Sequence, residues 1–127
     1  VSIKQRYPGH ATQVGHIASQ CFAGAYAGKW VIVTDEDIEV SNLEELIWAA
    51  LMCCDPATEL DIIKTAWTSP ADPRLHPDDK AAGNITNSRL IIDATKPFHW
   101  RDRFPQSTKP RQELLDMARK KFGYLVE

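Results

Sequence analysis

The sequence predicts an α/β domain of three layers, in which a mixed or parallel sheet is flanked by helices. Residues 30–33 are consecutive apolar β-formers without polar alternation, the pattern of a strand covered on both faces. Apolar residues at helical spacing, in 10–27 and in 42–54, precede and follow this strand. At 127 residues the chain has the length of one domain with a real hydrophobic core, so we expect a single domain over 1–127. A long proline-rich irregular segment and a C-terminal helix complete the prediction.

The first strand is expected within residues 1–7, where apolar and polar residues alternate before a Pro-Gly pair. Lys4 belongs to a polar group at the junction with the following helix, which also contains Arg6, Tyr7 and His10. The N-terminus of that helix would favour an anion such as phosphate. Solvated side chains that flank a turn fit the spacing equally well, so both interpretations stay open.

Residues 10–27 predict a helix whose apolar positions, three and four apart, share one face. These positions are Ala11, Val14, Ile17, Ala18, Cys21, Phe22 and Ala25. No charged residue lies between Arg6 and Lys29, although a solvent-facing helix normally carries several. A second row holds small side chains that would let another backbone approach closely: Gly15, Ser19, Ala23 and Ala27. Burial of this row inside the domain and an interface with another subunit or domain are equal alternatives.

The strand at 30–33 should lie in the interior of the sheet. Four carboxylates follow it, at the strand end where open α/β sheets usually hold ligands: Asp35, Glu36, Asp37 and Glu39. We assign them to the electrostatics of the next helix N-terminus, where acids are favoured, and not to a metal. A ligand-binding cluster is the alternative. The four histidines show no metal-ligand spacing, so neither metal ligands nor catalytic residues are predicted: His10, His16, His76 and His99.

A capping box predicts where the next helix begins, with Ser41 accepting from the backbone amide of Glu44 while Glu44 reaches back. Because residues 46–54 are apolar all round, we expect this helix to be buried on more than one side. Pro56 ends it, and residues 59–67 predict a further strand. The inner face of the helix is expected at Leu43, Leu46, Ile47, Ala50, Leu51 and Cys54.

Residues 68–109 contain five of the eight prolines and one strand-like island, 88–94. A connection this long is uncommon unless it is functional or lies over a neighbouring surface. Aromatic residues in this segment and directly before it indicate that it wraps around something: Trp67, Phe98, Trp100 and Phe104. Residues 110–122 then predict an amphipathic helix with Gly123 as its C-cap and with one apolar face: Leu114, Leu115, Ala118 and Phe122.

Composition narrows the class of protein. The chain is 25% charged and 43% apolar, and no apolar run approaches the length of a bilayer crossing, so no membrane partner is expected. Residues 1–64 carry 4 basic and 9 acidic side chains and residues 65–127 carry 11 and 8, too few cations for a nucleic-acid partner. The three cysteines, two of them adjacent, predict reduced thiols and a cytoplasmic location. A start at Val1 without an initiator Met is consistent with a piece of a longer protein.

Several motifs occur together in a fixed order along the chain. They are IKQRYPGHA at 3–11, VIVTDEDI at 31–38, IWA at 47–49, CDP at 54–56, NSR at 87–89 and DAT at 93–95. With the final helix they resemble, in register, the C-terminal domain of the UbiD-like decarboxylases. This is the family of 3-polyprenyl-4-hydroxybenzoate decarboxylase and ferulic acid decarboxylase.

The resemblance implies a reversible, non-oxidative carboxy-lyase that acts on aromatic, heteroaromatic or α,β-unsaturated carboxylic acids with prenylated FMN, a divalent metal (Mn²⁺ or Mg²⁺) and K⁺. In the family, the flavin, the metal ligands and the catalytic Glu-Arg-Glu residues belong mainly to an upstream domain, which would be the partner of this one. For this domain the resemblance implies homo-oligomerisation and closure over the active site. Lys4 matches a lysine that reaches the flavin phosphate. The isolated chain would then bind no cofactor and be inactive. The alternative is a stand-alone small structural or assembly subunit of a multi-subunit carboxylase.

Overall fold

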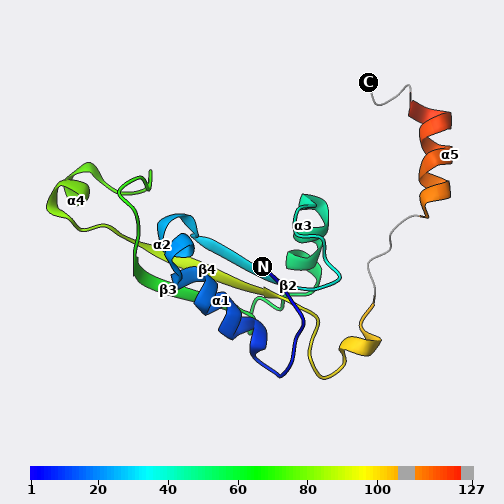
Figure 1. The fold of residues 1–127 in the computed structure, drawn as a ribbon, viewed down its shortest axis with the longest axis horizontal. Coiled ribbons are helices and arrows are strands. Elements are labelled where there is room, and N and C mark those ends of the chain that lie inside the picture. The colour runs from blue at the N-terminus through cyan, green and yellow to red at the C-terminus, as the bar shows by residue number, and fades with distance from the viewer. Residues whose placement is uncertain (106–110, 124–127) are drawn as a thin grey trace.

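The computed structural model describes residues 1–105 and 111–123. Within them, the strands form one four-stranded mixed sheet in the order β1-β2-β4-β3 (Figure 1). The strands are β1 (Ser2–Ile3), β2 (Trp30–Asp35), β3 (Leu60–Trp67) and β4 (Thr86–Ala94). The helices are α1 (His10–Gln20), α2 (Phe22–Ala27), α3 (Leu43–Met52), α4 (Pro77–Ala82) and α5 (Gln112–Phe122), with a 3₁₀ turn η1 (Arg101–Arg103).

The sheet lies between two helical layers. β2 and β4 run parallel in its interior, β1 joins β2 in parallel at one edge, and β3 joins β4 antiparallel at the other. Successive side chains of a strand point to opposite faces. Val31 and Val33 therefore pack with Ala11 of α1, whereas Ile92 packs with Ala49 of α3. Figure 1 shows α1 and α3 on either side of the sheet, which confirms the predicted three-layer α/β fold and the interior position of the strand at 30–33.

The predicted helix over 10–27 is two helices, because the backbone is extended at Cys21 (φ −65°, ψ 165°). The backbone on both sides of this break encloses the guanidinium of Arg89, a residue of β4 that is only 2% exposed. The guanidinium donates to five backbone carbonyl oxygens: those of Trp67 (2.6 Å), Ser19 (2.7 Å), Ala25 (2.8 Å), Gly28 (3.1 Å) and Gly24. An uninterrupted helix would direct its carbonyls along its own axis, so the break is what aims them at one cation. Residues 7–28, which contain no Lys, Arg, Asp or Glu, thus enclose the positive charge of Arg89 from β4.

The row of small residues in α1 faces the sheet. A Cβ atom added at Gly15 would lie 2.3 Å from Cγ2 of Ile91, and Ser19 is fully buried. Of the two alternatives for this row, burial inside the domain therefore holds for Gly15 and Ser19. Ala23 is exposed, and the side chain of Ala27 lies outside the described part of the chain.

The apolar face predicted for 10–27 is wrong at Cys21, which is exposed, and at two large residues. Ile17 is 61% exposed and Phe22 is 82% exposed, whereas Val14 and Ala18 pack against the core as expected. For Ile17 the physical reason is the close approach of α1 to the sheet, which accepts small residues such as Gly15 in the contact and leaves larger ones outside. Phe22 belongs to α2, and the break at Cys21 ends the helical register that would place it on the same face as α1.

The helix predicted at 42–54 is α3, but its cap differs by one residue. Asn42 Oδ1, and not Ser41, accepts from the backbone amides of Glu44 (3.1 Å) and Glu45 (3.5 Å). The Ser41 hydroxyl instead donates to Glu39 Oε1 at 2.7 Å. Asn and Ser are comparable N-caps, so the local sequence permits either start and the turn before the helix selects Asn42.

Within residues 1–105 and 111–123, α3 is buried on one side only, contrary to the expectation of two. Its buried positions are Ala49 and, just after the helix, Cys53, while Leu43, Ile47 and Leu51 are exposed. The sheet is the only described layer against which α3 packs, so the remaining apolar side chains form a row on the surface. The predicted inner face at Leu43, Ile47 and Leu51 is therefore wrong for this chain.

The segment expected to be irregular over 68–109 contains an additional helix, α4. His76 Nδ1 accepts from the Asp78 amide at 3.3 Å, Pro77 occupies the first turn, and Gly83 ends the helix at φ 76°. Proline at a helix start and glycine after its end were therefore the local signals that a helix-free prediction missed. β3 confirms the strand at 59–67, and the island at 88–94 lies within the longer β4.

Asp72 anchors the beginning of this segment. Its carboxylate accepts from Lys29 Nζ (2.6 Å), the backbone amide of Arg74 (2.9 Å) and Asn87 Nδ2 (3.1 Å). The hydrogen bond from Lys29, followed by that from the Arg74 amide, lowers the pKa of Asp72 to about 2. The aromatic rings farther along pack locally, with Trp100 and Phe104 centroids 5.1 Å apart. What the segment wraps around stays a prediction.

The C-terminal helix forms where it was predicted, as α5, and it stands apart from the sheet in Figure 1. Leu114, Met117 and Phe122 are exposed on it. Gly123 follows the helix with φ −56°, so this C-cap is not left-handed. Among the described helices, none combines the length and apolar composition that a membrane crossing requires.

Candidate functional site

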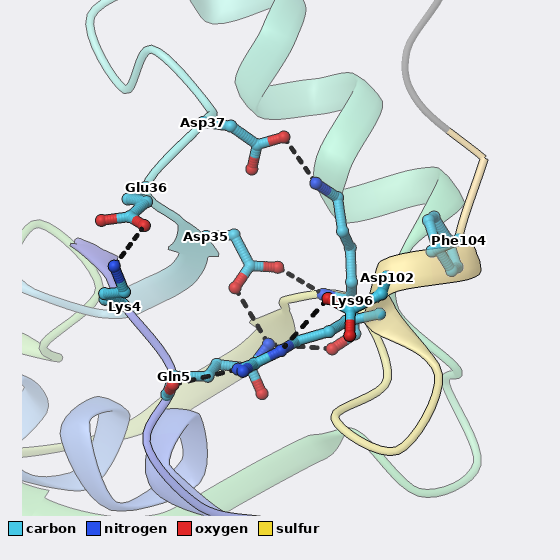
Figure 2. Close-up of a pocket in the computed structure, with 9 residues that line it drawn as sticks. Lys4, Gln5, Asp35, Glu36, Asp37, Lys96, Asp102 and Phe104 are labelled. Carbon is cyan, nitrogen blue, oxygen red and sulfur yellow. Dashed lines mark hydrogen bonds and ion pairs between the residues drawn. The ribbon is translucent and has the colours of Figure 1, made fainter.

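A cleft of about 490 Å³ lies where the carboxyl ends of the parallel strands β1, β2 and β4 meet. Its walls come from the chain that follows each of these strands (Figure 2). The lining residues are Lys4, Gln5, Asp35, Glu36, Asp37, Lys96, Arg101, Asp102 and Phe104. This edge is where open α/β sheets usually bind ligands, so the cleft is the candidate site.

Asp35, the last residue of β2, joins the ends of three strands. Its Oδ1 accepts from Gln5 Nε2 at 2.9 Å and its Oδ2 accepts from the backbone amide of Lys96 at 2.7 Å. The Gln5 amide also donates to the carbonyl oxygen of Lys96 at 2.8 Å. Gln5 is 6% exposed, and its side-chain NH₂ group serves two acceptors, as a buried polar group requires. Figure 2 shows these bonds converging on the floor of the cleft.

Lys96 is held by the acidic turn. Its Nζ lies 2.5 Å from Asp37 Oδ2, and its side chain is 16% exposed. The charges of Lys96 and Asp37 also act on the pKa of the nearby Cys53 thiol. Burial raises the pKa of the Cys53 thiol to about 11, and nearby Lys96 opposes this effect only in part. The thiol is therefore protonated near neutral pH and offers no thiolate nucleophile.

Lys4 is the most exposed of the three cations that line the cleft. Its Nζ lies 3.5 Å from Glu36 Oε1, and the two side chains are 67% and 62% exposed (Figure 2). Exposed ion pairs of this kind contribute at most about 1 kcal/mol. An anion that enters the cleft would therefore compete with a weak partner for the Lys4 ammonium.

Arg101 closes the cleft from η1. Its Nη1 donates to the backbone carbonyl oxygen of Gln5 at 3.0 Å, and its Cζ lies 4.8 Å from the centroid of the Phe98 ring. Its Nε is 3.9 Å from Asp102 Oδ1. These contacts hold the chain after β4 against the chain after β1.

The charges of the cleft largely neutralise one another. Three cations face four carboxylates, and Lys96 is paired with Asp37 while Asp35 accepts two hydrogen bonds. The cleft by itself is therefore not a strong anion site. It does fit a single contact with a phosphate through Lys4, if the rest of the phosphate site comes from elsewhere. Within residues 1–105 and 111–123, no three His, Cys, Asp or Glu side chains are grouped to hold a metal ion.

The structure separates the polar group predicted at the first junction. Lys4 lies at the cleft, whereas Tyr7 and His10 stack at the start of α1 with ring centroids 4.7 Å apart. The backbone amide of Arg6 donates to His10 Nδ1 at 3.3 Å. Turn formation thus accounts for Tyr7, His10 and the backbone of Arg6, and of this polar group only Lys4 lines the cleft.

The assignment of the acidic cluster to a helix N-terminus is wrong for Asp35, Glu36 and Asp37. α3 begins at Leu43, and the acids in its first turn are Glu44 and Glu45. Asp35 and Asp37 instead bond to residues that follow β1 and β4. The error arose because the loop between β2 and α3 is longer than a direct strand-to-helix turn.

Sequence reasoning missed Gln5, Lys96 and Arg101. Lys96 comes two residues after β4, so its position beyond a buried parallel strand was a usable signal. Gln5 carries no charge and gave no signal of its own. Its role depends on contact with Lys96, 91 residues later.

The family profile described as the 3-octaprenyl-4-hydroxybenzoate carboxy-lyase C-terminal domain matches residues 1–94. Similar proteins include a phenolic acid decarboxylase of Sedimentibacter hydroxybenzoicus, 32% identical over 117 residues, which cover 91% of this chain and 22% of that protein. A phenolic acid decarboxylase of Bacillus subtilis is 34% identical over 129 residues, covering 94% of this chain and 26% of that protein. The chain thus spans about a quarter of the length of these relatives.

Solved structures show the same fold. The UbiD-class enzyme HmfF from Pelotomaculum thermopropionicum, in complex with FMN, superposes with a TM-score of 0.71 at 25% identity, covering 92% of this chain and 24% of that one. Vanillic acid decarboxylase from Sedimentibacter hydroxybenzoicus, in an open form, gives a TM-score of 0.70 at 28% identity, covering 99% of this chain and 26% of that one.

Proposed function

Because the chain belongs to the family of 3-octaprenyl-4-hydroxybenzoate carboxy-lyase C-terminal domains, we propose that residues 1–127 are the C-terminal domain of a larger UbiD-type decarboxylase. The observation that carries this proposal is the family match over residues 1–94, which include the whole sheet and both helical layers. The names of the relatives support it, as does the quarter of their length that the chain spans.

The proposed reaction is a reversible, non-oxidative decarboxylation of an aromatic or α,β-unsaturated carboxylic acid. Prenylated FMN, when bound, supplies the covalent chemistry of that reaction. The phenolic and vanillic acid decarboxylases among the similar proteins support an aromatic substrate, and the FMN complex of HmfF supports a flavin.

In this proposal Lys4 binds the flavin phosphate and takes no part in the chemistry. Its ammonium is exposed at the ligand-binding edge of the sheet and is held only by a surface ion pair. The neutralised charges of the remaining cleft support a single, peripheral contact. The upstream domain would then hold most of the flavin, the divalent metal, K⁺ and the catalytic Glu-Arg-Glu residues.

We also propose that this domain forms homo-oligomers and closes over the active site. The exposed apolar row on α3 and the exposed apolar residues of α5 support such contacts, because large apolar patches on a monomer usually mark an interaction surface. The three free cysteines support a cytoplasmic enzyme.

A stand-alone structural or assembly subunit of a multi-subunit carboxylase is the second candidate. The internal pairing of most charges in the cleft favours it, because such a cleft could exist only to brace the strand ends. The intact mass of the natural protein separates the two candidates, since a decarboxylase of this type requires further domains.

The substitution Lys4→Ala in the full-length enzyme tests the proposal, with Lys64→Ala on the exposed edge strand β3 as the matched control. A charge-assisted hydrogen bond contributes about 1.5 kcal/mol or more, so Lys4→Ala should weaken FMN binding roughly tenfold. Enzyme that keeps its cofactor should turn over near the parent rate. A full flavin complement in Lys4→Ala would contradict the phosphate contact.

A further inference from the structure

The position of Lys4 depends on little regular structure. β1 is two residues long, and its pairing with β2 ends at Ile3 opposite Asp35. Lys4 is therefore the first residue beyond the strand. A long side chain on a free strand end would sample many directions, so something else must fix the backbone from which the Lys4 ammonium extends.

Gln5, the next residue, is fixed at both its side chain and its backbone. The side-chain amide donates to Asp35 and to the carbonyl oxygen of Lys96, and the backbone carbonyl accepts from Arg101. Through these contacts one buried residue, which follows β1, is joined to the last residue of β2 and to the chain segment that follows β4. Asp35 reinforces the junction because its second oxygen accepts from the Lys96 amide.

The chemistry of the junction selects glutamine. Both partners of the Gln5 side chain are acceptors, a carboxylate and a carbonyl, so the residue between them must donate twice and carry no negative charge. A glutamate here would place a second carboxylate against Asp35. A methionine would have the same length but no donor.

From this geometry we propose that Gln5 is a positioning residue, which holds Lys4 toward the flavin phosphate. The inference rests on the proposed function, because it concerns the same phosphate contact. Gln5 itself touches neither phosphate nor substrate. Its contribution to flavin binding passes entirely through the Lys4 ammonium.

A double-mutant cycle in the full-length enzyme tests this, with Lys4→Ala, Gln5→Met and the double variant titrated with FMN and, separately, with riboflavin. Riboflavin lacks the phosphate, so a contact made through Lys4 contributes only to FMN binding. We expect Gln5→Met to weaken FMN binding about tenfold, like Lys4→Ala, and to leave riboflavin binding unchanged. The double variant should bind FMN no more weakly than Lys4→Ala alone. Gln20→Met, at an exposed glutamine of α1, is the control and should bind both flavins like the parent.

Three results would overturn the inference: parent-like FMN affinity in Gln5→Met, equal weakening of FMN and riboflavin, or effects that multiply to about a hundredfold in the double variant. Each leaves the proposed function intact provided that Lys4→Ala weakens FMN binding. If Lys4→Ala binds FMN like the parent, the phosphate contact itself fails. Should Gln5→Met not fold, Asp35→Asn keeps the shape of the Asp35 side chain but leaves one carbonyl oxygen for two donors, Gln5 Nε2 and the Lys96 amide, and the same cycle with Lys4→Ala applies.

Discussion

Arg89 offers the sharpest test of how this fold is held together. Arg89→Met keeps most of the apolar stem but removes every donor from a site that is 2% exposed. Five backbone carbonyls from three segments would lose their shared partner. An acceptor buried without a partner costs about 1–3 kcal/mol, and the carbonyls share four N–H groups of the guanidinium, so their losses are not additive. We therefore expect the free energy of unfolding to fall by about 3–5 kcal/mol, as when one member of a buried charged network is removed.

Urea denaturation followed by circular dichroism measures this change. Arg89→Lys should fall between the parent and Arg89→Met, because an ammonium has three donors on one atom and cannot span carbonyls that a planar guanidinium reaches. Arg74→Met, at an exposed position, is the matched control and should change the stability by less than about 0.5 kcal/mol. A loss below about 1 kcal/mol in Arg89→Met would refute the idea that this cation organises the break between α1 and α2.

Two further predictions concern packing and pH. Gly15→Ala should destabilise the protein by about 1 kcal/mol in the same assay, because the added Cβ meets the stiff side chain of Ile91. This clash outweighs the gain in helix propensity. Gly123→Ala, where a Cβ meets open space, is the control and should leave the stability unchanged. The pKa of Asp72 is lowered from 3.8 to about 2, chiefly by the hydrogen bond from Lys29, so between these pH values the unfolded chain binds more protons and stability should fall as the pH falls. Acid titration of the unfolding free energy should show this decrease in the parent and a shallower one in Asp72→Asn; equal slopes would contradict the assignment.

Much of the fold followed from local pattern. The strand at 30–33 was predicted as interior because its residues are apolar without alternation. A strand that helices cover on both faces has no solvent-facing side and therefore needs no polar residues. Helix periodicity located α1, α3 and α5. Periodicity could not reveal the break at Cys21, because the cause is the guanidinium of Arg89, which lies far away in sequence.

The location of the candidate site could be predicted from the sequence, but only some of its residues could. Asp35 and Asp37 end a buried strand, which is why the sequence marked that edge. Their partners could not be predicted, since the same acids fit a helix N-terminus until the strand order is known. Exposed Ile17 and Phe22 show the same limit, because spacing defines a helix face but reveals neither how closely that face approaches the sheet nor that the helix breaks before Phe22.

By itself the sequence determined the order and type of most elements, the likeness to the UbiD-type C-terminal domain, and Lys4 as the residue to test, because each of these depends on neighbours in the chain. The tertiary structure decided that Gln5 and Lys96, 91 residues apart, meet beside Asp35 at one edge of the sheet. The physical reason is that β1, β2 and β4 are adjacent and parallel in space although they are distant in sequence. Hydrogen bonds between their ends therefore exist only once the strand order and register are fixed.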